Sequence, residues 1–165
     1  MTNEEIEFLK ESNAIEREYS DKALQDAIKA WQYLKKQDKL TDKVVLRTHE
    51  LLTKRIMHPD ASGRLRQCKV YIGGREGMEW RMIPDALDEW CKDANTSAKV
   101  PGIDGKHIKI DHVAYEKIHP FVDGNGRTGR MFLNWARIKA GLPILIIHEG
   151  AEQYEYYKWF EDPRA

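Results

Sequence analysis

Residues 119–130 read HPFVDGNGRTGR and bring together a proton acceptor, a carboxylate, a glycine-rich turn and two guanidiniums. Gly124 and Gly126 can adopt backbone angles that other residues avoid, so the amides between them can point inward and form an anion site. A helix that begins there would add its own unpaired amides and its dipole. Arg127 and Arg130 would lie on one face of that helix, where guanidiniums suit phosphate oxygens. The segment therefore predicts a polyphosphate site.

Two further side chains of this segment suit chemistry on a polyphosphate. Asp123 offers a hard oxygen ligand, and proteins usually hold Mg²⁺ through one or two carboxylates together with substrate phosphates. His119 carries the side chain whose unperturbed pKa is best suited to accepting a proton near neutral pH. A hydroxyl deprotonated by His119 could attack a phosphorus atom that Mg²⁺ and arginine polarise. The chemistry expected is transfer of a phosphoryl or nucleotidyl group.

The same twelve residues resemble the signature loop of the Fic family, His-x-Phe-x-Asp/Glu-Gly-Asn-Gly-Arg-x-x-Arg, and every specified position is filled. Most Fic proteins transfer AMP from ATP onto a Tyr, Thr or Ser hydroxyl of a target protein. The resemblance implies that this chain is a protein adenylyltransferase that uses ATP as substrate. Gly126 and Arg127 separate it from the related Doc kinases, in which the second glycine and the following arginine are replaced. The alternative from the residues alone is a tight turn with solvated arginines.

The resemblance also implies a role for each residue of the loop. His119 is the expected general base, and Asp123 is the expected Mg²⁺ ligand. The residues expected to contact the phosphates are Gly124, Asn125, Gly126, Arg127 and Arg130. Of the two arginines, Arg127 is expected to bind the inner phosphates and Arg130 the γ-phosphate. Phe121 is expected to anchor the loop in the core.

Composition predicts one domain over residues 1–165. Of the 165 residues 41% are hydrophobic, which is enough for one core. Lys+Arg 27 balance Asp+Glu 27, so no basic field favours nucleic acid as a partner. Cys68 and Cys91 lack the spacing of a metal site and are expected to be reduced thiols, with a bridge between them as the less favoured alternative. No apolar run follows the N-terminus, so we expect no signal peptide, no membrane span and a cytoplasmic protein.

Apolar residues recur at helical spacing through most of the chain and predict an all-α fold. Helices are expected over residues 21–37, 42–57, 84–95 and 106–119, with Ser20 and Thr41 as the N-caps of the first two. Two more are expected, one that begins directly after the Gly-Asn-Gly turn and one over about 150–160. His119 would stand at the end of one helix, and the phosphate-binding turn would begin the next. Loops are expected at Gly73-Gly74 and over 99–105.

Residues 68–83 depart from the helical pattern and predict a β-hairpin that turns at Gly73-Gly74. The Fic fold is all-α with one such hairpin, a flap beside the active-site loop that holds the target segment. The edge of the flap could pair with an extended target strand and present a hydroxyl to His119. The docking residues expected on it are Val70, Tyr71, Ile72 and Gly73, with packing in the core as the alternative for the apolar side chains.

An N-terminal helix over about 4–18 carries a second motif, because Ser12 and Glu16 are four residues apart and share one helical face. The pair resembles the inhibitory helix of the family, Ser/Thr-x-x-x-Glu-Gly/Asn. The resemblance implies that Glu16 pairs with Arg130 and so displaces the γ-phosphate. Arg17 stands where the family has glycine or asparagine, and we expect it to let the helix continue and weaken this lock. A surface helix with an ordinary Glu-Arg pair is the alternative.

Several other histidines and tyrosines could be given functional roles. The histidines His49, His107 and His112 lack the spacing of a metal site, so structural or surface roles are expected for them. Three tyrosines, Tyr154, Tyr156 and Tyr157, crowd the last helix. Tyr157 is the candidate for stacking on adenine, and helix packing explains it equally well.

The function expected is transfer of AMP from Mg²⁺-bound ATP to a protein hydroxyl, restrained by Glu16. Partners expected are a target protein and, through automodification or a homodimer, a second copy of the chain. One variant of this function moves another nucleotide, or removes AMP from a target with Glu16 orienting a water. A non-catalytic module that binds a nucleotide or a partner is the alternative from another class. Such a module would have no chemical need for His119 and Asp123 together.

Overall fold

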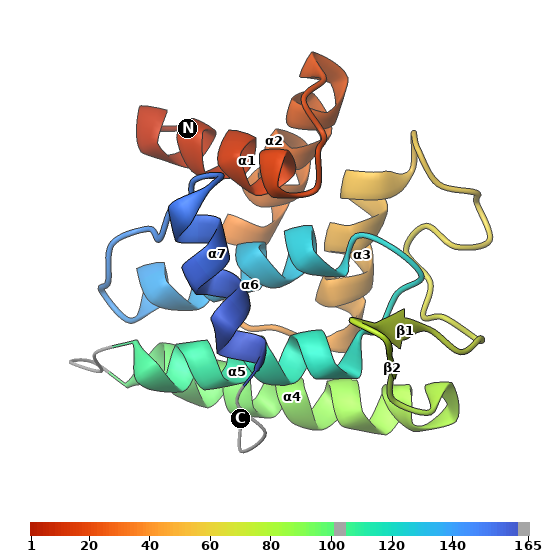
Figure 1. The fold of residues 1–165 in the computed structure, drawn as a ribbon. Coiled ribbons are helices and arrows are strands. Elements are labelled where there is room, and N and C mark those ends of the chain that lie inside the picture. The colour runs from red at the N-terminus through yellow and green to blue at the C-terminus, as the bar shows by residue number, and fades with distance from the viewer. Residues whose placement is uncertain (101–104, 162–165) are drawn as a thin grey trace.

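The computed structural model describes residues 1–100 and 105–161, and helices dominate both ranges (Figure 1). The helices in these ranges are α1 (Asn3–Ile15), α2 (Asp21–Lys35), α3 (Asp42–Thr53), α4 (Ile83–Lys99), α5 (Lys106–Ile118), α6 (Asn125–Lys139) and α7 (Ala151–Tyr157), with 3-10 turns at Trp80–Met82 and Lys158–Phe160. The strands β1 (Tyr71–Ile72) and β2 (Arg75–Glu76) form an antiparallel hairpin. The predicted all-α fold with one hairpin is confirmed. Most of the loop expected over 99–105 lies outside the described residues.

Helix α6 occupies the centre of the fold, where it contacts α1, α2, α3, α4 and α5 (Figure 1). Almost every residue from its start to Ala136 is buried, which is typical of a helix that is covered on all sides. Aromatic rings of three helices meet beside it: Trp90 of α4, Tyr115 of α5 and Phe132 of α6 pack with centroid separations of 4.9 to 5.6 Å. The core therefore fixes the first turn of α6 and, with it, the phosphate-binding turn.

The N-terminal ends of the helices follow their sequence signals more closely than the C-terminal ends. Ser20 caps α2 and Thr41 caps α3 through hydrogen bonds from the third residue of each helix, as predicted. Helix α3 ends at Thr53, earlier than predicted, and is followed by turns that lead to Pro59. Helix α4 runs beyond the predicted end to Lys99, because no helix-breaking residue occurs before Pro101.

The hairpin is shorter than the segment predicted for it. Gly73 and Gly74 have φ of 56° and 81°, the left-handed pair that a two-residue hairpin turn requires. Beyond the strands, the Gly77 amide donates to the Val70 carbonyl at 2.8 Å. Residues 80–82 form a 3-10 turn that leads into α4, so they do not extend the hairpin.

The prediction that Arg17 lets the first helix continue is wrong. Helix α1 ends at Ile15, and Arg17 adopts a left-handed conformation with φ of 59°. The Arg17 amide donates to the Ala14 carbonyl at 2.9 Å, and the Glu18 amide donates to the Asn13 carbonyl at 3.0 Å. These two bonds form a Schellman C-cap, in which glycine or asparagine usually takes the left-handed position. Arg17 fills that position at a cost of about 1–2 kcal/mol.

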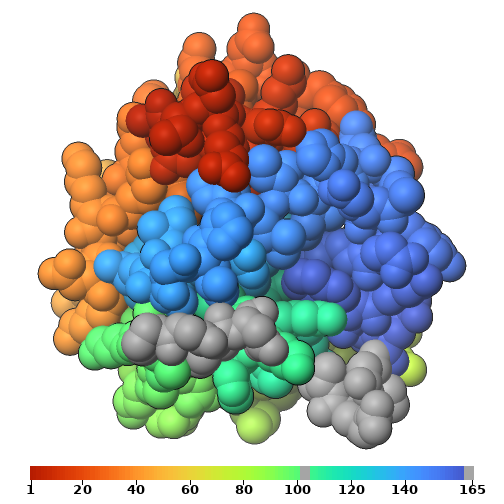
Figure 2. Space-filling view, turned by 90° about the vertical axis from the view of Figure 1, so that its left-hand side faces the viewer, coloured from red at the N-terminus to blue at the C-terminus, as the bar shows by residue number. Residues whose placement is uncertain are grey.

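The N-terminal helix packs against the segment that follows α6, as Figure 2 shows, where the red and blue parts of the chain lie against each other. Ile15, Ile147 and Tyr156 form a small apolar cluster between these segments. Elsewhere, Cys68 is exposed, Cys91 is buried, and both are free thiols. Within the described ranges, no helix has the length and apolar character needed to cross a membrane.

Candidate active site

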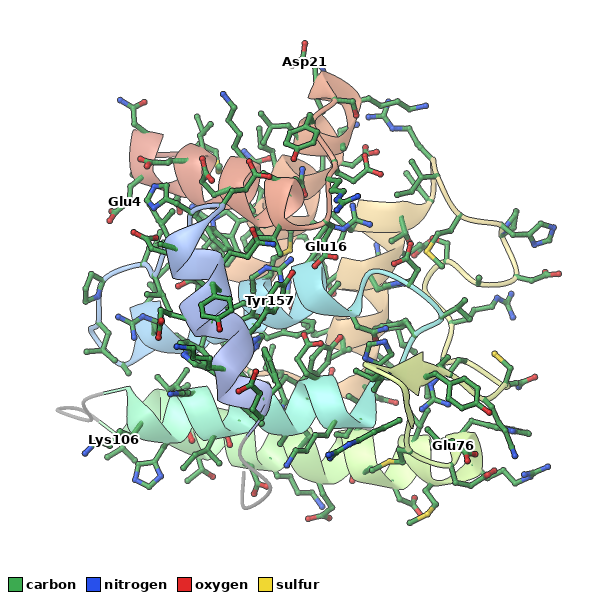
Figure 3. The ribbon with its side chains drawn as sticks, viewed as in Figure 1. Glu4, Glu16, Asp21, Glu76, Lys106 and Tyr157 are labelled. Carbon is green, nitrogen blue, oxygen red and sulfur yellow. The ribbon has the colours of Figure 1, made fainter. Side chains whose placement is uncertain are left out.

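A cavity of about 770 Å³ gathers the loop, the hairpin and the end of α1. Its lining residues are Glu16 at the end of α1; Ile72, Gly73, Arg75, Glu76, Gly77 and Met78 of the hairpin; Glu116, Lys117 and His119 at the end of α5; residues 122–126 and Arg130; and Tyr156, Tyr157 and Phe160 near the C-terminus. Figure 3 shows Glu16 above the start of α6, Tyr157 on α7 and Glu76 on the hairpin. The volume is in the range of small-molecule sites.

His119 forms the C-cap of α5 in a left-handed conformation, with φ of 49° and ψ of 63°. Its Nδ1 lies 3.2 Å from the Glu116 carbonyl oxygen. Because a carbonyl oxygen only accepts, Nδ1 carries the hydrogen and Nε2 keeps its lone pair. Burial lowers the pKa of His119, and the Arg66 charge lowers it further, whereas the bond to Glu116 and the charges of Asp123 and Glu16 oppose the shift without cancelling it. The imidazole is therefore a neutral proton acceptor near neutral pH.

The loop after His119 is braced from within. The Asn125 side chain accepts from the Phe121 amide at 2.9 Å and donates to the Phe121 carbonyl at 2.8 Å. Phe121 is fully buried and stacks on His49 with a centroid separation of 3.7 Å, so it anchors the loop as predicted. Since both polar groups of the Asn125 side chain are engaged, its backbone amide is the group left to face an anion.

His49 supports the same loop from α3, through partners that no sequence signal indicated. Its Nδ1 accepts from the Gly63 amide at 2.9 Å, so its Nε2 donates to the Asp123 carbonyl at 2.8 Å. Burial lowers its pKa to about 4, which keeps the ring neutral. The predicted structural role of His49 is confirmed, and His107 lies on the surface.

The first turn of α6 lines the cavity. Gly124 caps the helix with φ of 84°, and the amides of the first turn have no partner within the helix. A Cβ on Gly126 would lie 2.5 Å from Glu16 Oε1 and 3.0 Å from Arg130 Nη1, so a larger residue there would displace the ends of these two side chains. Asp123 is exposed in the cavity wall, and its Oδ1 accepts from the Gly124 amide at 2.7 Å.

Arg130 is buried, with 3% of its surface exposed, and Ser12 of α1 and the C-cap residue Glu16 bind its guanidinium. Its Nη2 donates to Glu16 Oε1 at 2.7 Å and to the Ser12 carbonyl at 3.0 Å, and its Nε donates to Ser12 Oγ at 2.8 Å. The structure therefore brings Ser12 and Glu16 to Arg130, 118 and 114 residues away in sequence. The surface-helix alternative for this pair does not hold.

Tyr156 contacts Arg130 from the opposite side, which the sequence did not indicate. His112 Nδ1 lies 3.1 Å from the Gly129 carbonyl and donates to it, so His112 Nε2 accepts from the Tyr156 hydroxyl at 2.7 Å. The same hydroxyl accepts from Arg130 Nη1 at 3.4 Å. Tyr157 lines the cavity as a half-exposed ring, and its hydroxyl accepts from Gln153. Tyr156, the neighbour of the predicted adenine-stacking residue Tyr157, is thus the tyrosine that contacts Arg130.

Arg127 is not brought into the cavity wall, although it was expected to bind phosphate. Its side chain is buried, with 3% exposed, and it does not line the cavity. Within the described residues, its Nε and Nη1 have no hydrogen-bond partner. Unsatisfied donors on a buried guanidinium are costly, and the described side chains supply no acceptor for these two.

Glu116 adds a carboxyl group that sequence reasoning missed. It lines the cavity, and its Oε1 is buried without a partner among the described residues. Burial raises its pKa to about 7, with Arg130 opposing and Glu16 reinforcing the shift. A Cβ on Gly129 would lie 2.6 Å from this oxygen, so Glu116 packs on that glycine. Its helix position, three residues before His119, carried no recognisable motif.

The predicted docking residues of the flap have different environments. Ile72 and Gly73 line the cavity, and Tyr71 is exposed to 70% outside its lining. Val70 is partly buried, and its Cγ2 would lie 2.9 Å from a Cβ on Gly77, so it packs within the hairpin. The flap therefore faces the cavity through Ile72, Gly73 and the segment 75–78.

A family model and several curated proteins match the sequence of this chain. The model of the family described as Fic/DOC matches residues 39–136, a range that contains the loop but neither α1 nor α7. The protein adenylyltransferase Fic of Drosophila ananassae is 27% identical over 125 residues, which cover 74% of this chain and 24% of that protein. That of Aedes aegypti is 28% identical over 129 residues, 76% of this chain and 25% of that protein. The chain thus spans about a quarter of the length of the curated relatives it matches.

Solved structures show the same fold. Fic-1 from C. elegans superimposes with a TM-score of 0.79 at 21% identity, covering 99% of this chain and 58% of that one. BepC from Bartonella tribocorum, solved with bound AMPPNP, gives a TM-score of 0.55 at 18% identity, covering 78% of this chain and 69% of that one. The matched range is more than half of the chain and includes every specified position of the loop. The chain belongs to the Fic/DOC family.

Proposed function

We propose that this protein is a Mg²⁺-dependent protein adenylyltransferase that moves AMP from ATP to a Tyr, Thr or Ser hydroxyl of a target protein. The observation that carries the proposal is the meeting of His119, Asp123, the amides of the α6 N-terminus and Arg130 in one cavity. The name of the curated relatives, protein adenylyltransferase Fic, supports the same activity.

His119 is the proposed general base of this reaction. The oxygen of the target hydroxyl attacks the α-phosphorus of ATP and passes its proton to Nε2 of His119, while the bond to the β-phosphate oxygen breaks. The products are the AMP ester of the target and diphosphate. Nε2 is suited to this step because Nδ1 is engaged with the Glu116 carbonyl. The lowered pKa of His119 keeps the base deprotonated at neutral pH.

The start of α6 is the proposed binding site for the phosphates. The amides of Asn125 and Gly126 and the helix dipole favour negative charge there. The Gly124 amide would join them on leaving Asp123 Oδ1, to which it donates. Arg130 would hold the γ-phosphate, and Arg127 would gain its missing acceptor if the inner phosphates drew it toward them. The bound AMPPNP of BepC agrees with a nucleotide in this fold.

Asp123 is the proposed Mg²⁺ ligand. It is exposed in the cavity wall, and no three His, Cys, Asp or Glu side chains of the described residues form a complete metal site. This donor set fits Mg²⁺, which one carboxylate can hold together with substrate phosphates. When bound, the ion would neutralise charge on the phosphates.

Restraint by α1 is the second part of the proposal. Glu16 Oε1 accepts a hydrogen bond from Arg130 Nη2 at 2.7 Å, and Ser12 accepts two further hydrogen bonds from the same guanidinium. A γ-phosphate would have to compete with Glu16 for this guanidinium. Release of Glu16 is therefore expected to precede productive binding of ATP, with the flap then presenting the target segment.

Mass spectrometry of the purified protein after incubation with ATP and Mg²⁺ tests the activity. We expect a mass gain of one AMP on a Tyr, Thr or Ser of the chain itself, and none with His119→Ala. Parallel labelling with ATP, GTP, CTP and UTP separates AMP transfer from transfer of another nucleotide. Hydrolytic release of AMP from a pre-labelled protein would favour the variant that removes AMP from a target with a water.

Two outcomes would contradict the proposal. Incorporation that survives in His119→Ala would exclude His119 as the base. Absence of incorporation with every nucleotide, in the parent and in Glu16→Gly, would leave a module that only binds a nucleotide or a partner. Retained ATP binding by His119→Ala serves as the control for folding.

A further inference from the structure

Arg66 joins the two legs of the flap through one buried guanidinium. Its side chain is 2% exposed, and it belongs to none of the motifs identified in the sequence. Its Nη1 donates to the Cys68 carbonyl at 2.8 Å, on the leg that enters the hairpin. Its Nη2 donates to the Met78 carbonyl at 2.7 Å, on the leg that leaves it. One side chain therefore links the two legs, in addition to the backbone bond from the Gly77 amide to the Val70 carbonyl.

The same side chain holds the end of α5, where the proposed base is located. Arg66 Nε donates to the His119 carbonyl at 2.7 Å, and Nη2 also donates to the Ile118 carbonyl at 3.3 Å. The Arg66 amide donates to the Pro120 carbonyl at 2.9 Å, which adds a backbone link to the loop. The last carbonyls of a helix lack partners within it and attract cations. Arg66 satisfies two of them and braces the left-handed backbone of His119.

An arginine is needed for this arrangement, because one planar group must reach four carbonyls in different directions. Within the described part of the chain, every hydrogen bond of the Arg66 side chain goes to a backbone carbonyl. Burial of a charge without a bonded carboxylate is costly, and here burial lowers the pKa of Arg66. A site concerned only with packing would favour a neutral side chain.

We propose that Arg66 is a positioning residue that holds the flap and His119 in one fixed arrangement, so that a target segment bound to the flap presents its hydroxyl to Nε2. The inference rests on the proposed adenylyl transfer for its chemistry. Its structural part, the coupling of the flap to the base, is independent of that function. A displacement of about 1 Å between reacting groups can cost about a hundredfold in rate.

Three variants, made in Glu16→Gly to give measurable rates, separate the charge of Arg66 from its hydrogen bonds. Arg66→Met keeps the length of the side chain and removes both charge and donors. Arg66→Lys keeps the charge but cannot reach four carbonyls. Arg64→Met, at an exposed position two residues away, is the matched control. Each variant is compared with its parent by thermal unfolding, hydrogen exchange of the Gly77 amide, ATP binding and automodification as a function of pH.

We expect Arg66→Met to speed exchange of the Gly77 amide and to lower the rate of automodification by about a hundredfold. ATP affinity of the folded fraction should stay at the parent value, because the phosphate-binding turn is not touched. The acidic limb of the rate profile should move to higher pH, since the charge that lowers the pKa of His119 is gone. Arg66→Lys should recover part of the rate and keep the acidic limb in place. Arg64→Met should match the parent in every measurement.

Three results would overturn the inference. One is a folded Arg66→Met that labels at the parent rate with an unchanged acidic limb. Another is a loss of labelling and ATP binding in equal proportion to the unfolded fraction, which indicates a purely structural role. If Arg66→Met does not fold, the labelling rate, the acidic limb and the ATP binding of Arg66→Lys are compared with the parent in the same way. A parent that incorporates no nucleotide would instead overturn the proposed function. The coupling of the flap to His119 would then be judged from hydrogen exchange of the Gly77 amide alone. The third overturning result is an exchange rate in Arg66→Met that equals that of the parent.

Discussion

Replacement of Glu16 by glycine removes the carboxylate that contacts Arg130. The contact to be lost joins Glu16 Oε1 and Arg130 Nη2 at 2.7 Å, and the guanidinium is only 3% exposed. Two bonds from Arg130 to Ser12, at 2.8 and 3.0 Å, do not depend on the side chain at position 16. The substitution should therefore weaken the hold of α1 on Arg130 without abolishing it.

The size of the effect follows from the exposure of the two partners. A hydrogen bond to a charged group contributes about 1.5–3 kcal/mol when it is shielded from water. The Glu16 side chain is 41% exposed, and solvent screening reduces the contribution of such a pair to about 1–2 kcal/mol. If Glu16 and the γ-phosphate compete for Arg130, its removal should raise the population that binds ATP productively by about 5–30-fold.

The assay is the initial rate of automodification with labelled ATP, at an ATP concentration well below saturation. Glu16→Gly should exceed the parent by the factor given above, and Glu16→Gln should lie between them, because the amide still accepts a hydrogen bond but carries no charge. Glu4→Gln is the matched control, since Glu4 is an exposed carboxylate at the other end of the same helix (Figure 3). It should label at the parent rate.

Equal rates for the parent and Glu16→Gly would refute the reasoning, because the ion pair would then not compete with the nucleotide. A rise of the same size in Glu4→Gln would also refute it, since general loosening of α1 would then be sufficient. ATP affinity measured in the absence of turnover should rise in parallel with the rate. An increase in rate without an increase in affinity would exclude competition for Arg130.

Three further substitutions test other parts of the site. Arg17→Gly relieves the strain of the left-handed backbone at φ of 59° and should stabilise the protein by about 1 kcal/mol, which raises Tm by about 2–4 °C. It should also lower the labelling rate, and an unchanged or lower Tm would contradict the prediction. Glu116 has a folded-state pKa raised from 4.5 to about 7, so between these values the folded state keeps a proton that the unfolded state releases, and stability falls as pH rises. Denaturant unfolding of Glu116→Gln should show the variant gaining about 1–3 kcal/mol on the parent from about pH 5 to pH 8, whereas a constant difference would contradict the raised pKa. Tyr156→Phe removes the hydroxyl that links Arg130 to His112, so Tm should fall by about 2–6 °C, and an unchanged Tm would show that the link adds no stability.

The sequence by itself determined those features whose residues are adjacent or periodic. The loop over 119–130 was recognisable because its glycines, carboxylate and arginines are contiguous and need only one turn and one helix start to converge. Helical periodicity predicted the fold class, Ser20 and Thr41 predicted two helix starts, and the Gly73-Gly74 pair predicted the hairpin turn. Each of these signals is local, because the hydrogen bonds that satisfy it span four residues or fewer.

The conformation at Arg17 shows where local reasoning failed. Helix propensity favours arginine in a helix, yet the chain ends α1 there and places Arg17 in a left-handed turn. Ile15 contacts Ile147 and Tyr156, and Glu16 bonds to Arg130, in the last turn before that end. The cap bonds from the Arg17 and Glu18 amides accompany this helix end, which a propensity difference of less than about 1 kcal/mol did not predict.

Only the tertiary structure decided which distant groups meet at the site. Arg66 reaches His119 across 53 residues, and His49 reaches the Asp123 carbonyl across 74. Such contacts depend on how buried helices pack, and no spacing in one sequence encodes them. The same packing buried Arg127 outside the cavity lining, although its helical spacing from Arg130 predicted that both arginines would face the phosphates. The sequence alone thus determined the type of chemistry at the loop, and the tertiary structure decided which side chains hold its base, its flap and its arginines in place.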